Sequence, residues 1–363
     1  MEIKKRSRLS WIAVLLLVAV LTGGSFLLAR LFVGNRSTTL TRATLLPCEP
    51  TQNIQPLGNG LVYYDGNLLR RLDGSGQQSW SCMVGAGADY EAGKHGVAAW
   101  NGTMLTLLDA SGGASLYSGN MEKSILSAHM GSKYAAVLTG AENDSTLIVM
   151  ERAGKQVDAI RFENKTVMDY GFFSDGAMLW VMTLDTEGTS PMSAISTYRP
   201  GRSLAGTITD AGQVVYHVLF EDAQIRAVGT DYIKSYDYTG PEVTSARKLV
   251  YGWYMAAAGQ GNDPALCFVP MSQADGSLKV NDVRLIRASS ERRVHMPFTC
   301  SSLLMQGSTL YGFSGQYAMI CGPDAAKPTV YTLPLTTDRV IGLTDSQSAI
   351  LVSGDQVYLV PLN

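Results

Sequence analysis

Two patterns of hydrophobic and polar positions divide the chain. The first is a single apolar stretch, Leu9 to Ala29, which contains no charged residue and is close to the roughly 20 residues that a membrane-spanning helix needs. The second begins near Leu57, where short runs rich in Val, Tyr, Leu and Thr alternate with clusters of Gly, Asp, Asn and Ser. These runs show no sustained helical period, so they predict short strands joined by tight turns and an all-β fold.

The residues around the apolar stretch predict its orientation. Four basic residues and one acid precede it, namely Lys4, Lys5, Arg6, Arg8 and Glu2. Basic residues are retained on the cytoplasmic side of a membrane, so the N-terminus should be cytoplasmic and the rest of the chain extracytoplasmic. Three arginines that follow the stretch weaken this bias, namely Arg30, Arg36 and Arg42.

A cleaved signal peptide is the alternative to this anchor. The apolar stretch is longer than the roughly 7 to 15 residues of a signal-peptide core, and no convincing small-x-small cleavage site follows it. We therefore expect a single-pass protein of the plasma membrane. Its expected parts are a cytoplasmic tail (1–8), a transmembrane helix (9–29), a tether (30–37) and an extracytoplasmic domain (38–363).

The turns of that domain recur at a regular distance. The first unit has apolar runs at Gly60–Tyr64, Leu68–Leu72 and Gln77–Val84, and its first turn, Asp-Gly-Asn, favours a hairpin. Turns like the second one of this unit fall at Gly76, Gly112, Gly154, Gly201 and Gly240, near Ser290 and near Asp324. Their spacing of roughly 34 to 50 residues is close to that of four-stranded β-propeller blades.

The end of the chain adds a further blade to the seven turns. Residues 338–363 supply three more expected strands, Arg339–Leu343, Ser348–Val352 and Val357–Leu362. Thr38–Leu46 would be the fourth, which pairs the two ends of the domain and removes an open sheet edge. We therefore expect an eight-bladed β-propeller. Seven blades are the alternative, because the boundaries between Tyr216 and Phe298 are ambiguous.

One of these turns carries a longer motif. Its residues are Leu72, Asp73, Ser75, Gly76 and Trp80. The motif resembles the repeat of quinoprotein-type (PQQ-like) β-propellers, in which Asp would cap the turn and Trp would wedge between blades. A second copy has Asp109, Ser111 and Gly112, with Leu116 at the expected Trp position, and a third has Asp237, Thr239 and Gly240 without Trp.

The resemblance implies two kinds of relative. The family contains alcohol and glucose dehydrogenases with a bound quinone and calcium, and also non-enzymatic envelope scaffolds. The dehydrogenases use a pair of adjacent cysteines or aromatic stacking above the quinone. The five cysteines of this chain are never adjacent, at Cys48, Cys82, Cys267, Cys300 and Cys321. This departure favours a membrane-anchored, non-enzymatic member without a cofactor.

Composition and spacing give no catalytic chemistry. A net charge of −2 and 17% charged residues offer no case for nucleic-acid binding. The four histidines are at least 34 residues apart, namely His95, His129, His217 and His295, and no CxxC pair occurs. Short-range metal motifs are therefore missing. We expect no enzyme activity and no metal site.

Two clusters are candidate interaction surfaces. Tyr232, Tyr236 and Tyr238 alternate along an expected strand beside Lys234, so they should share one face; packing between blades is one interpretation and an exposed aromatic strip for sugar or protein is the other. The second cluster is Arg284, Arg287, Arg292 and Arg293. Either it protects a solvated edge strand or it contacts an anionic envelope polymer or lipid.

These observations favour one function over another. The first hypothesis is a membrane-anchored scaffold whose propeller binds another envelope protein. The alternative is a solute- or glycan-binding protein, or an enzyme, that uses the central channel of the propeller. The alternative predicts acids, histidines or aromatic residues that converge at one mouth of the ring.

Overall fold

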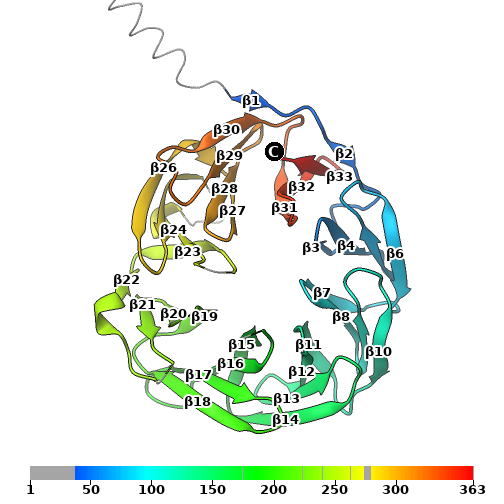
Figure 1. Cartoon of the computed structure of the whole chain (residues 1–363), viewed down its shortest axis with the longest axis vertical. Helices are drawn as coiled ribbons and strands as arrows, with labels where there is room; N and C mark the ends of the chain where they lie inside the picture. The colour runs from blue at the N-terminus through cyan, green and yellow to red at the C-terminus, as the bar shows by residue number, and fades with distance from the viewer. Residues whose placement is uncertain are drawn as a thin grey trace, which may run out of the picture.

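Eight sheets stand around a central axis in the computed structural model, which describes residues 37–362 apart from 174, 223, 239, 262 and 274–278 (Figure 1). Seven sheets have four strands and one has five. The expected eight-bladed propeller is therefore confirmed, and the seven-bladed alternative is wrong. We number the blades 1 to 8 in chain order, starting at Ile54.

Blades 1 to 4 each consist of four consecutive strands that run from the axis to the rim. Blade 1 contains β3 (Ile54–Leu57), β4 (Gly60–Tyr64), β5 (Leu68–Leu72) and β6 (Gln78–Met83). Blade 2 contains β7 (Asp89–Gly93), β8 (Gly96–Asn101), β9 (Met104–Leu108) and β10 (Ser115–Asn120). Blade 3 contains β11 (Ile125–Met130), β12 (Tyr134–Ala141), β13 (Asp144–Glu151) and β14 (Gln156–Glu163). Blade 4 contains β15 (Thr166–Phe173), β16 (Met178–Asp185), β17 (Met192–Arg199) and β18 (Ser203–Asp210).

Blades 5 to 8 repeat this plan with two short 3₁₀ helices. Blade 5 contains β19 (Val215–Phe220), β20 (Ile225–Gly229), β21 (Tyr232–Tyr236), η1 (Thr244–Ala246) and β22 (Lys248–Leu249). Blade 6 contains β23 (Trp253–Ala258), β24 (Leu266–Pro270), η2 (Met271–Gln273), β25 (Val280–Ile286) and β26 (Glu291–Cys300). Blade 7 contains β27 (Ser302–Gln306), β28 (Thr309–Phe313), β29 (Tyr317–Cys321) and β30 (Thr329–Thr332). Blade 8 contains β31 (Arg339–Leu343), β32 (Ser348–Ser353) and β33 (Gln356–Pro361).

The segment before blade 1 closes the ring. Its strand β2 (Thr44–Leu45) pairs antiparallel with β33 and becomes the fourth strand of blade 8. Its strand β1 (Thr38–Thr39) instead pairs parallel with β30 and becomes a fifth strand of blade 7. The expected closing strand Thr38–Leu46 is thus confirmed for its second half only. The segment covers two neighbouring edges because it runs along the rim from one blade to the next (Figure 1).

The seven turns used to count blades all join the third strand of a blade to the fourth. In blade 1 the Asp73 carboxylate accepts hydrogen bonds from the N–H groups of Ser75 and Gln77, at 2.8 and 3.0 Å, and from the Ser75 hydroxyl. Gly76 has a φ of +82°, which favours glycine. Local chemistry therefore fixes this turn, and that is why it could be found in the sequence.

The hydrophobic core is divided among the contacts between neighbouring blades, which we call seams. The buried residues form eight clusters, and each cluster joins two adjacent blades. Leu72 of blade 1, for example, packs in one cluster with Val352 of blade 8. A single blade cannot cover both of its own faces, so burial requires the closed ring.

The expected membrane anchor lies outside the described residues. The tail, the apolar stretch 9–29 and the tether up to residue 36 all belong to that part of the chain. Within residues 37–362, with the gaps given above, no helix is long and apolar enough to cross a membrane.

Candidate functional site

The outer strands of blades 1 to 3 each carry a side chain that contacts the turn of the next blade. Trp80 of β6 lies against Gly113, where a Cβ atom would come within 2.5 Å of the indole ring. Tyr117 of β10 lies against Gly154, where a Cβ atom would come within 1.9 Å of the phenol ring. In blade 3 the Asp158 carboxylate accepts a hydrogen bond from the N–H of Gly201. We call this place in each outer strand the wedge position.

Two details of the expected repeat are corrected by the register. Leu116 was expected where Trp80 stands, but a β-bulge between Ser115 and Tyr117 puts Tyr117 opposite Leu107, as Trp80 is opposite Arg71. In the same turn Gly113, not Gly112, has the positive φ of +65°. The second turn is one residue longer than the first, and this insertion displaces the motif.

The seam between blades 4 and 5 has no wedge side chain. Across the bulge of β18, Gly206 lies opposite Thr197 and therefore occupies the position of Trp80 and Tyr117. On the facing turn, a Cβ atom at Gly240 would meet no described atom within 4 Å outside its immediate neighbours. A cleft of about 1020 Å³ opens at this seam, which we call the blade 4–5 cleft.

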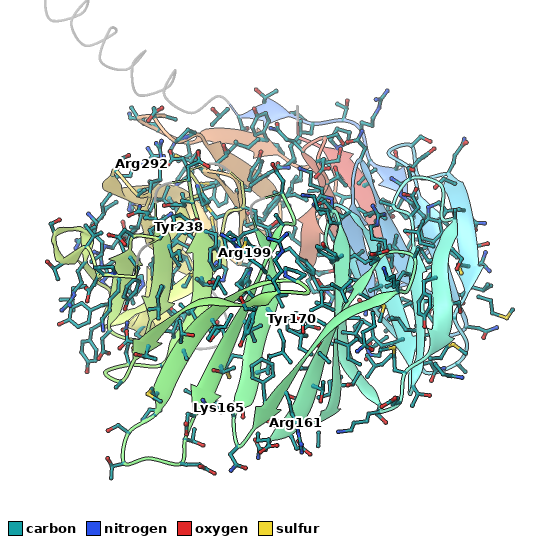
Figure 2. All side chains as sticks on the ribbon, turned by 60° about the horizontal axis from the view of Figure 1, so that its bottom comes forward. Arg161, Lys165, Tyr170, Arg199, Tyr238 and Arg292 are labelled. Carbon is teal, nitrogen blue, oxygen red and sulfur yellow. The ribbon has the colours of Figure 1, made fainter. Side chains whose placement is uncertain are left out.

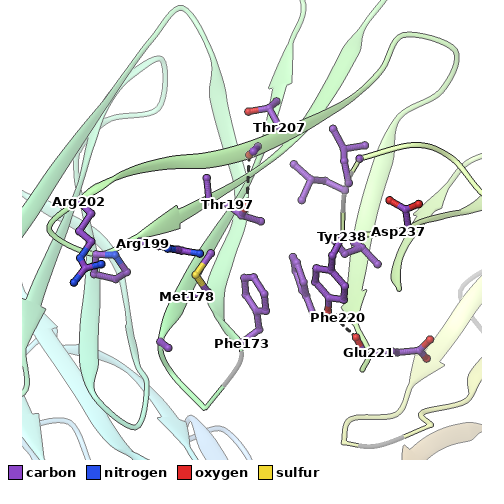
Figure 3. Close-up of a pocket in the computed structure, with 18 of the residues that line it drawn as sticks. Phe173, Met178, Thr197, Arg199, Arg202, Thr207, Phe220, Glu221, Asp237 and Tyr238 are labelled. Atoms are coloured by element: carbon purple, nitrogen blue, oxygen red, sulfur yellow. Dashed lines mark hydrogen bonds between the residues drawn. The ribbon is translucent and has the colours of Figure 1, made fainter. Parts of the chain in front are cut away.

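Aromatic rings form the floor of the blade 4–5 cleft (Figure 3). Phe173 at the end of β15 stacks on Phe220 at the end of β19, with ring centroids 4.2 Å apart. Tyr238 lies over Phe173 at 6.4 Å, and its hydroxyl donates a hydrogen bond of 2.6 Å to the carbonyl of Glu221. The floor is therefore apolar and held in place from both blades.

The two walls of the cleft differ in charge. Arg199 and Arg202 flank the turn on the blade 4 side, and Glu221 and Asp237 lie on the blade 5 side (Figure 3). Glu221 is already neutralised by a buried ion pair with Arg226. Arg199 and Arg202, in contrast, make no ion pair with any described residue, so the blade 4 wall offers two cations to a ligand.

A second hollow, of about 970 Å³, borders the central channel along the inner strands β11, β15 and β19. His129 Nδ1 lies 2.5 Å from a carboxylate oxygen of Glu91, and its ring stacks on Phe172. Desolvation inside the channel raises the pKa of the nearby Asp169 carboxyl. Burial lowers the pKa of His217, whose Nε2 has no hydrogen-bond partner among the described residues.

Acids, histidines and aromatic rings thus line this hollow along most of β15, whereas the channel alternative predicts them at one mouth of the ring. They do not amount to a metal centre, since no group of three or more His, Cys, Asp or Glu side chains in the described chain is placed to hold a metal ion. Phe173, Phe220 and Asp222 border both hollows. The stacked phenylalanines therefore separate the blade 4–5 cleft from the channel.

The three candidate tyrosines do not form one exposed strip. Tyr236 is 6% exposed and packs in the core cluster between blades 4 and 5. Tyr232 is half-buried beneath the guanidinium of Arg247. Tyr238 is 48% exposed, but it lies beyond the end of β21, at the blade 4–5 cleft. The tyrosines do not share one exposed face because β21 ends at Tyr236. Binding at Tyr232 or Tyr238 stays a prediction.

The four candidate arginines mostly tie blades together. Arg284 binds Glu291 at 2.6 Å and the carbonyl of Leu249 in blade 5 at 2.7 Å. Arg287 pairs with Asp263 and Asp324, and Arg292 donates to the carbonyls of Gly322 and Ala325 in blade 7, both at 2.6 Å. Arg293 lies over the ring of Trp253. These contacts leave Arg293 as the member of the set with no ion pair or hydrogen bond among the described residues.

Sequence reasoning missed an exposed apolar surface on blades 5 and 6. Leu249, Tyr251, Tyr254 and Met271 are 56, 74, 54 and 68% exposed. The N–H of Met271 donates to the carbonyl of Gly252, which holds the two segments together. We call this surface the aromatic–methionine patch. The aromatic run at 251–254 was the available signal, but a sequence does not show which of its rings face solvent.

Figure 2 shows how blade 4 and its neighbours are oriented. Arg199 and Tyr238 lie toward one end of the ring, and Arg161 and Lys165 lie at the other. The blade 4–5 cleft is at the first end, because it is built from turns that join first to second and third to fourth strands. The aromatic–methionine patch is at the opposite end, because it lies on a connection between blades and on one between second and third strands.

Comparisons with known proteins support the fold. The chain is similar to BamB from Moraxella catarrhalis, with a TM-score of 0.56, 14% identity, and coverage of 89% of this chain and 98% of that one. It is also similar to the C-terminal WD40 domain of Sif2, with a TM-score of 0.62, 11% identity, and coverage of 91% and 100%. No protein-family model and no curated protein sequence matches the chain. Identities this low show a shared β-propeller fold alone, and the quinoprotein-type resemblance stays a prediction.

Proposed function

We propose that this chain is a scaffold that binds another envelope protein and catalyses no reaction itself. In this proposal the stretch 9–29 is an uncleaved plasma-membrane anchor, the N-terminus is cytoplasmic and the propeller is extracytoplasmic. The observation that supports partner binding is the aromatic–methionine patch, with Tyr251 and Met271 each more than two-thirds exposed. Large apolar side chains grouped on a surface are typical of protein-binding sites.

The composition of the patch favours a protein partner. Tyr and Met are enriched in interfaces, and the guanidinium groups of Arg284 and Arg293 lie over the ring of Trp253 beside them, 5.7 and 5.6 Å from its centroid. Rigid aromatic side chains lose little conformational entropy when a partner covers them. The patch therefore presents anchors whose positions are set before binding.

The test is in-cell crosslinking of the full-length protein, followed by affinity capture and mass spectrometry. The double variant Tyr251→Ser/Met271→Ser should lose a partner that the native chain captures in near-stoichiometric amount. Met83→Ser is the matched control, because Met83 is 69% exposed on blade 1 and Met271 is 68% exposed. Equal capture by the native chain and the patch variant would contradict the proposal.

The orientation needs a separate test. Gly188 lies exposed at a hairpin tip of blade 4, so a cysteine introduced there is open to solvent. A membrane-impermeant maleimide should label Gly188→Cys in intact cells if the propeller is extracytoplasmic, while the native chain serves as the background. Labelling only after lysis would place the propeller in the cytoplasm.

Solute binding in the channel is the second candidate function. It is favoured by the convergence of Glu91, His129, Asp169 and His217 on one hollow. The test is to measure the melting temperature of the full-length protein with each member of a panel of sugars and organic cations. A ligand of this site should stabilise the native chain and lose that effect in Asp169→Asn. If no compound of the panel has this effect, the scaffold function explains the structure better than solute binding does.

A further inference from the structure

The outer strand of blade 4 is an unprotected sheet edge. β18 is the last strand of its sheet, so its outer backbone groups have no strand partner in the described chain. Residues 203–209 contain neither a charged side chain nor proline. Proteins usually guard such edges with charge, proline or short length, because an open edge is a template for another strand.

Most of the other outer strands are guarded. β14 is also eight residues long but carries Asp158, Arg161 and Glu163, and β26 carries Arg292, Arg293 and Pro297. β30 is covered by β1. β22 and β2 have two residues each, and β6 and β10 have six. β6 and β10 also lack charge and proline, but β18 is longer, with seven uncharged residues before the buried Asp210.

The blade 4–5 cleft lies beside this edge. Alternate side chains of a strand added to β18 would point toward blade 5, where the missing wedge at Gly206 leaves room for them. Tyr238 lies on the turn between the third and fourth strands of blade 5 and is 48% exposed, so its ring can stack on an aromatic side chain in this space. Space and stacking therefore favour a large ring from an added strand.

The charges of the cleft indicate which residues an added strand should carry beside its aromatic side chain. Arg199 and Arg202 stand at the end of the cleft where β18 begins, without an acidic partner in the described part of the chain. Arginine forms strong, directed pairs with carboxylates. A segment with an acid near its aromatic residue would satisfy both features at once.

We propose that β18 and the blade 4–5 cleft form a docking site for an extended acidic segment of a partner protein. The segment adds a strand to blade 4, places an aromatic side chain in the space between Gly206 and Gly240 toward Tyr238, and directs a carboxylate to Arg199 and Arg202. This inference rests on the proposed scaffold function but uses a surface at the opposite end of the ring from the aromatic–methionine patch. Main-chain pairing supplies affinity and the cleft supplies selectivity.

Gly206→Trp is the decisive variant, because it supplies the wedge that blade 4 lacks. A Cβ atom at Gly206 would meet Thr197 Oγ1 at 3.8 Å, an ordinary contact, and Gly206 has no positive φ, so the fold accepts a side chain there. Gly188→Trp is the matched control at the other end of the same blade. Melting temperatures of both variants show that each propeller is intact.

The probe is a displayed library of random ten-residue peptides, selected on the full-length protein in detergent micelles. We expect the enriched peptides to share an aromatic residue and a nearby acid. Their affinity, measured by fluorescence anisotropy, should fall at least tenfold for Gly206→Trp and for Arg202→Glu but not for Gly188→Trp. Changing the acid of the peptide to lysine should restore binding to Arg202→Glu.

Three outcomes would overturn the inference. The first is a selection without a shared acidic and aromatic pattern, and the second is enriched peptides that bind Gly206→Trp as well as the native chain. The third is a concentration-dependent dimer that Gly206→Trp abolishes in sedimentation, because the occupant would then be a second copy of this chain. The double variant Tyr251→Ser/Met271→Ser separates this inference from the scaffold proposal. It should still bind the enriched peptides but no longer capture the cellular partner.

Discussion

Replacing Trp80 by Ala tests whether the seams depend on the wedge side chains. Trp80 is 8% exposed and its ring contacts Gly113 of the next blade. Truncating a buried Trp to Ala costs about 3–5 kcal/mol. The buried indole N–H, however, has no hydrogen-bond partner among the described residues, and removing such a donor recovers about 1–3 kcal/mol. The midpoints of these two ranges differ by about 2 kcal/mol, which is the expected loss of unfolding free energy.

The assay is calorimetric unfolding of the full-length protein in detergent. At about 2 °C per kcal/mol for a domain of this size, Trp80→Ala should melt about 4 °C lower than the native chain. Trp80→Phe keeps most of the ring and discards the unpaired N–H, so it should melt within about 2 °C of the native chain. An unchanged melting temperature for Trp80→Ala would refute the wedge argument. A Phe variant as unstable as the Ala variant would show that the N–H, not the ring, stabilises the seam.

Two further predictions concern polar contacts in the ring. Arg292→Ala removes two hydrogen bonds to blade 7 carbonyls, so it should cost about 1–3 kcal/mol in chemical denaturation. Arg293→Ala loses the contact with Trp253 and should cost about 0.5–1 kcal/mol. Burial raises the pKa of Asp210, but hydrogen bonds from Lys234, Gly212 and Gln213 outweigh it and hold that pKa below its ordinary value of 3.8. The native chain should therefore be more stable than Asp210→Asn above about pH 4, and lose that advantage as the pH falls through the lowered pKa. A difference that grows in acid would contradict this assignment.

Much of the fold was present in local sequence. The turn at Asp73 is built by its own side chain, and glycine at position 76 is required by a positive φ, so both leave a signature within a few residues. The strand pairs of blade 8 were also predictable, because short apolar runs separated by turns fix register locally. The pairing of Thr38 and Thr39 with β30 was not predictable. A two-residue strand has too short a pattern of apolar and polar positions to indicate which of two neighbouring sheet edges it joins.

The motif copy at Asp109 shows where spacing alone misleads. One extra turn residue and a bulge move the wedge from Leu116 to Tyr117, and only pairing with Leu107 reveals the shift. The tyrosine strip failed for a related reason, because β21 ends before Tyr238. Strand ends and bulges depend on contacts with neighbouring strands, and these contacts are distant in the sequence.

The blade 4–5 cleft could not be predicted, because it arises from a missing side chain. Gly206 is one of 37 glycines, and only its pairing with Thr197 identifies it as the counterpart of Trp80. Cleft and patch lie at opposite ends of the ring and share no residue. Effects at separate sites combine additively when neither change moves the other surface. Combining Gly206→Trp with Tyr251→Ser should therefore weaken a partner that uses both surfaces by the product of the two separate fold-changes in Kd. If the double variant loses no more affinity than the more damaging of the two single variants, the partner uses only one end of the ring.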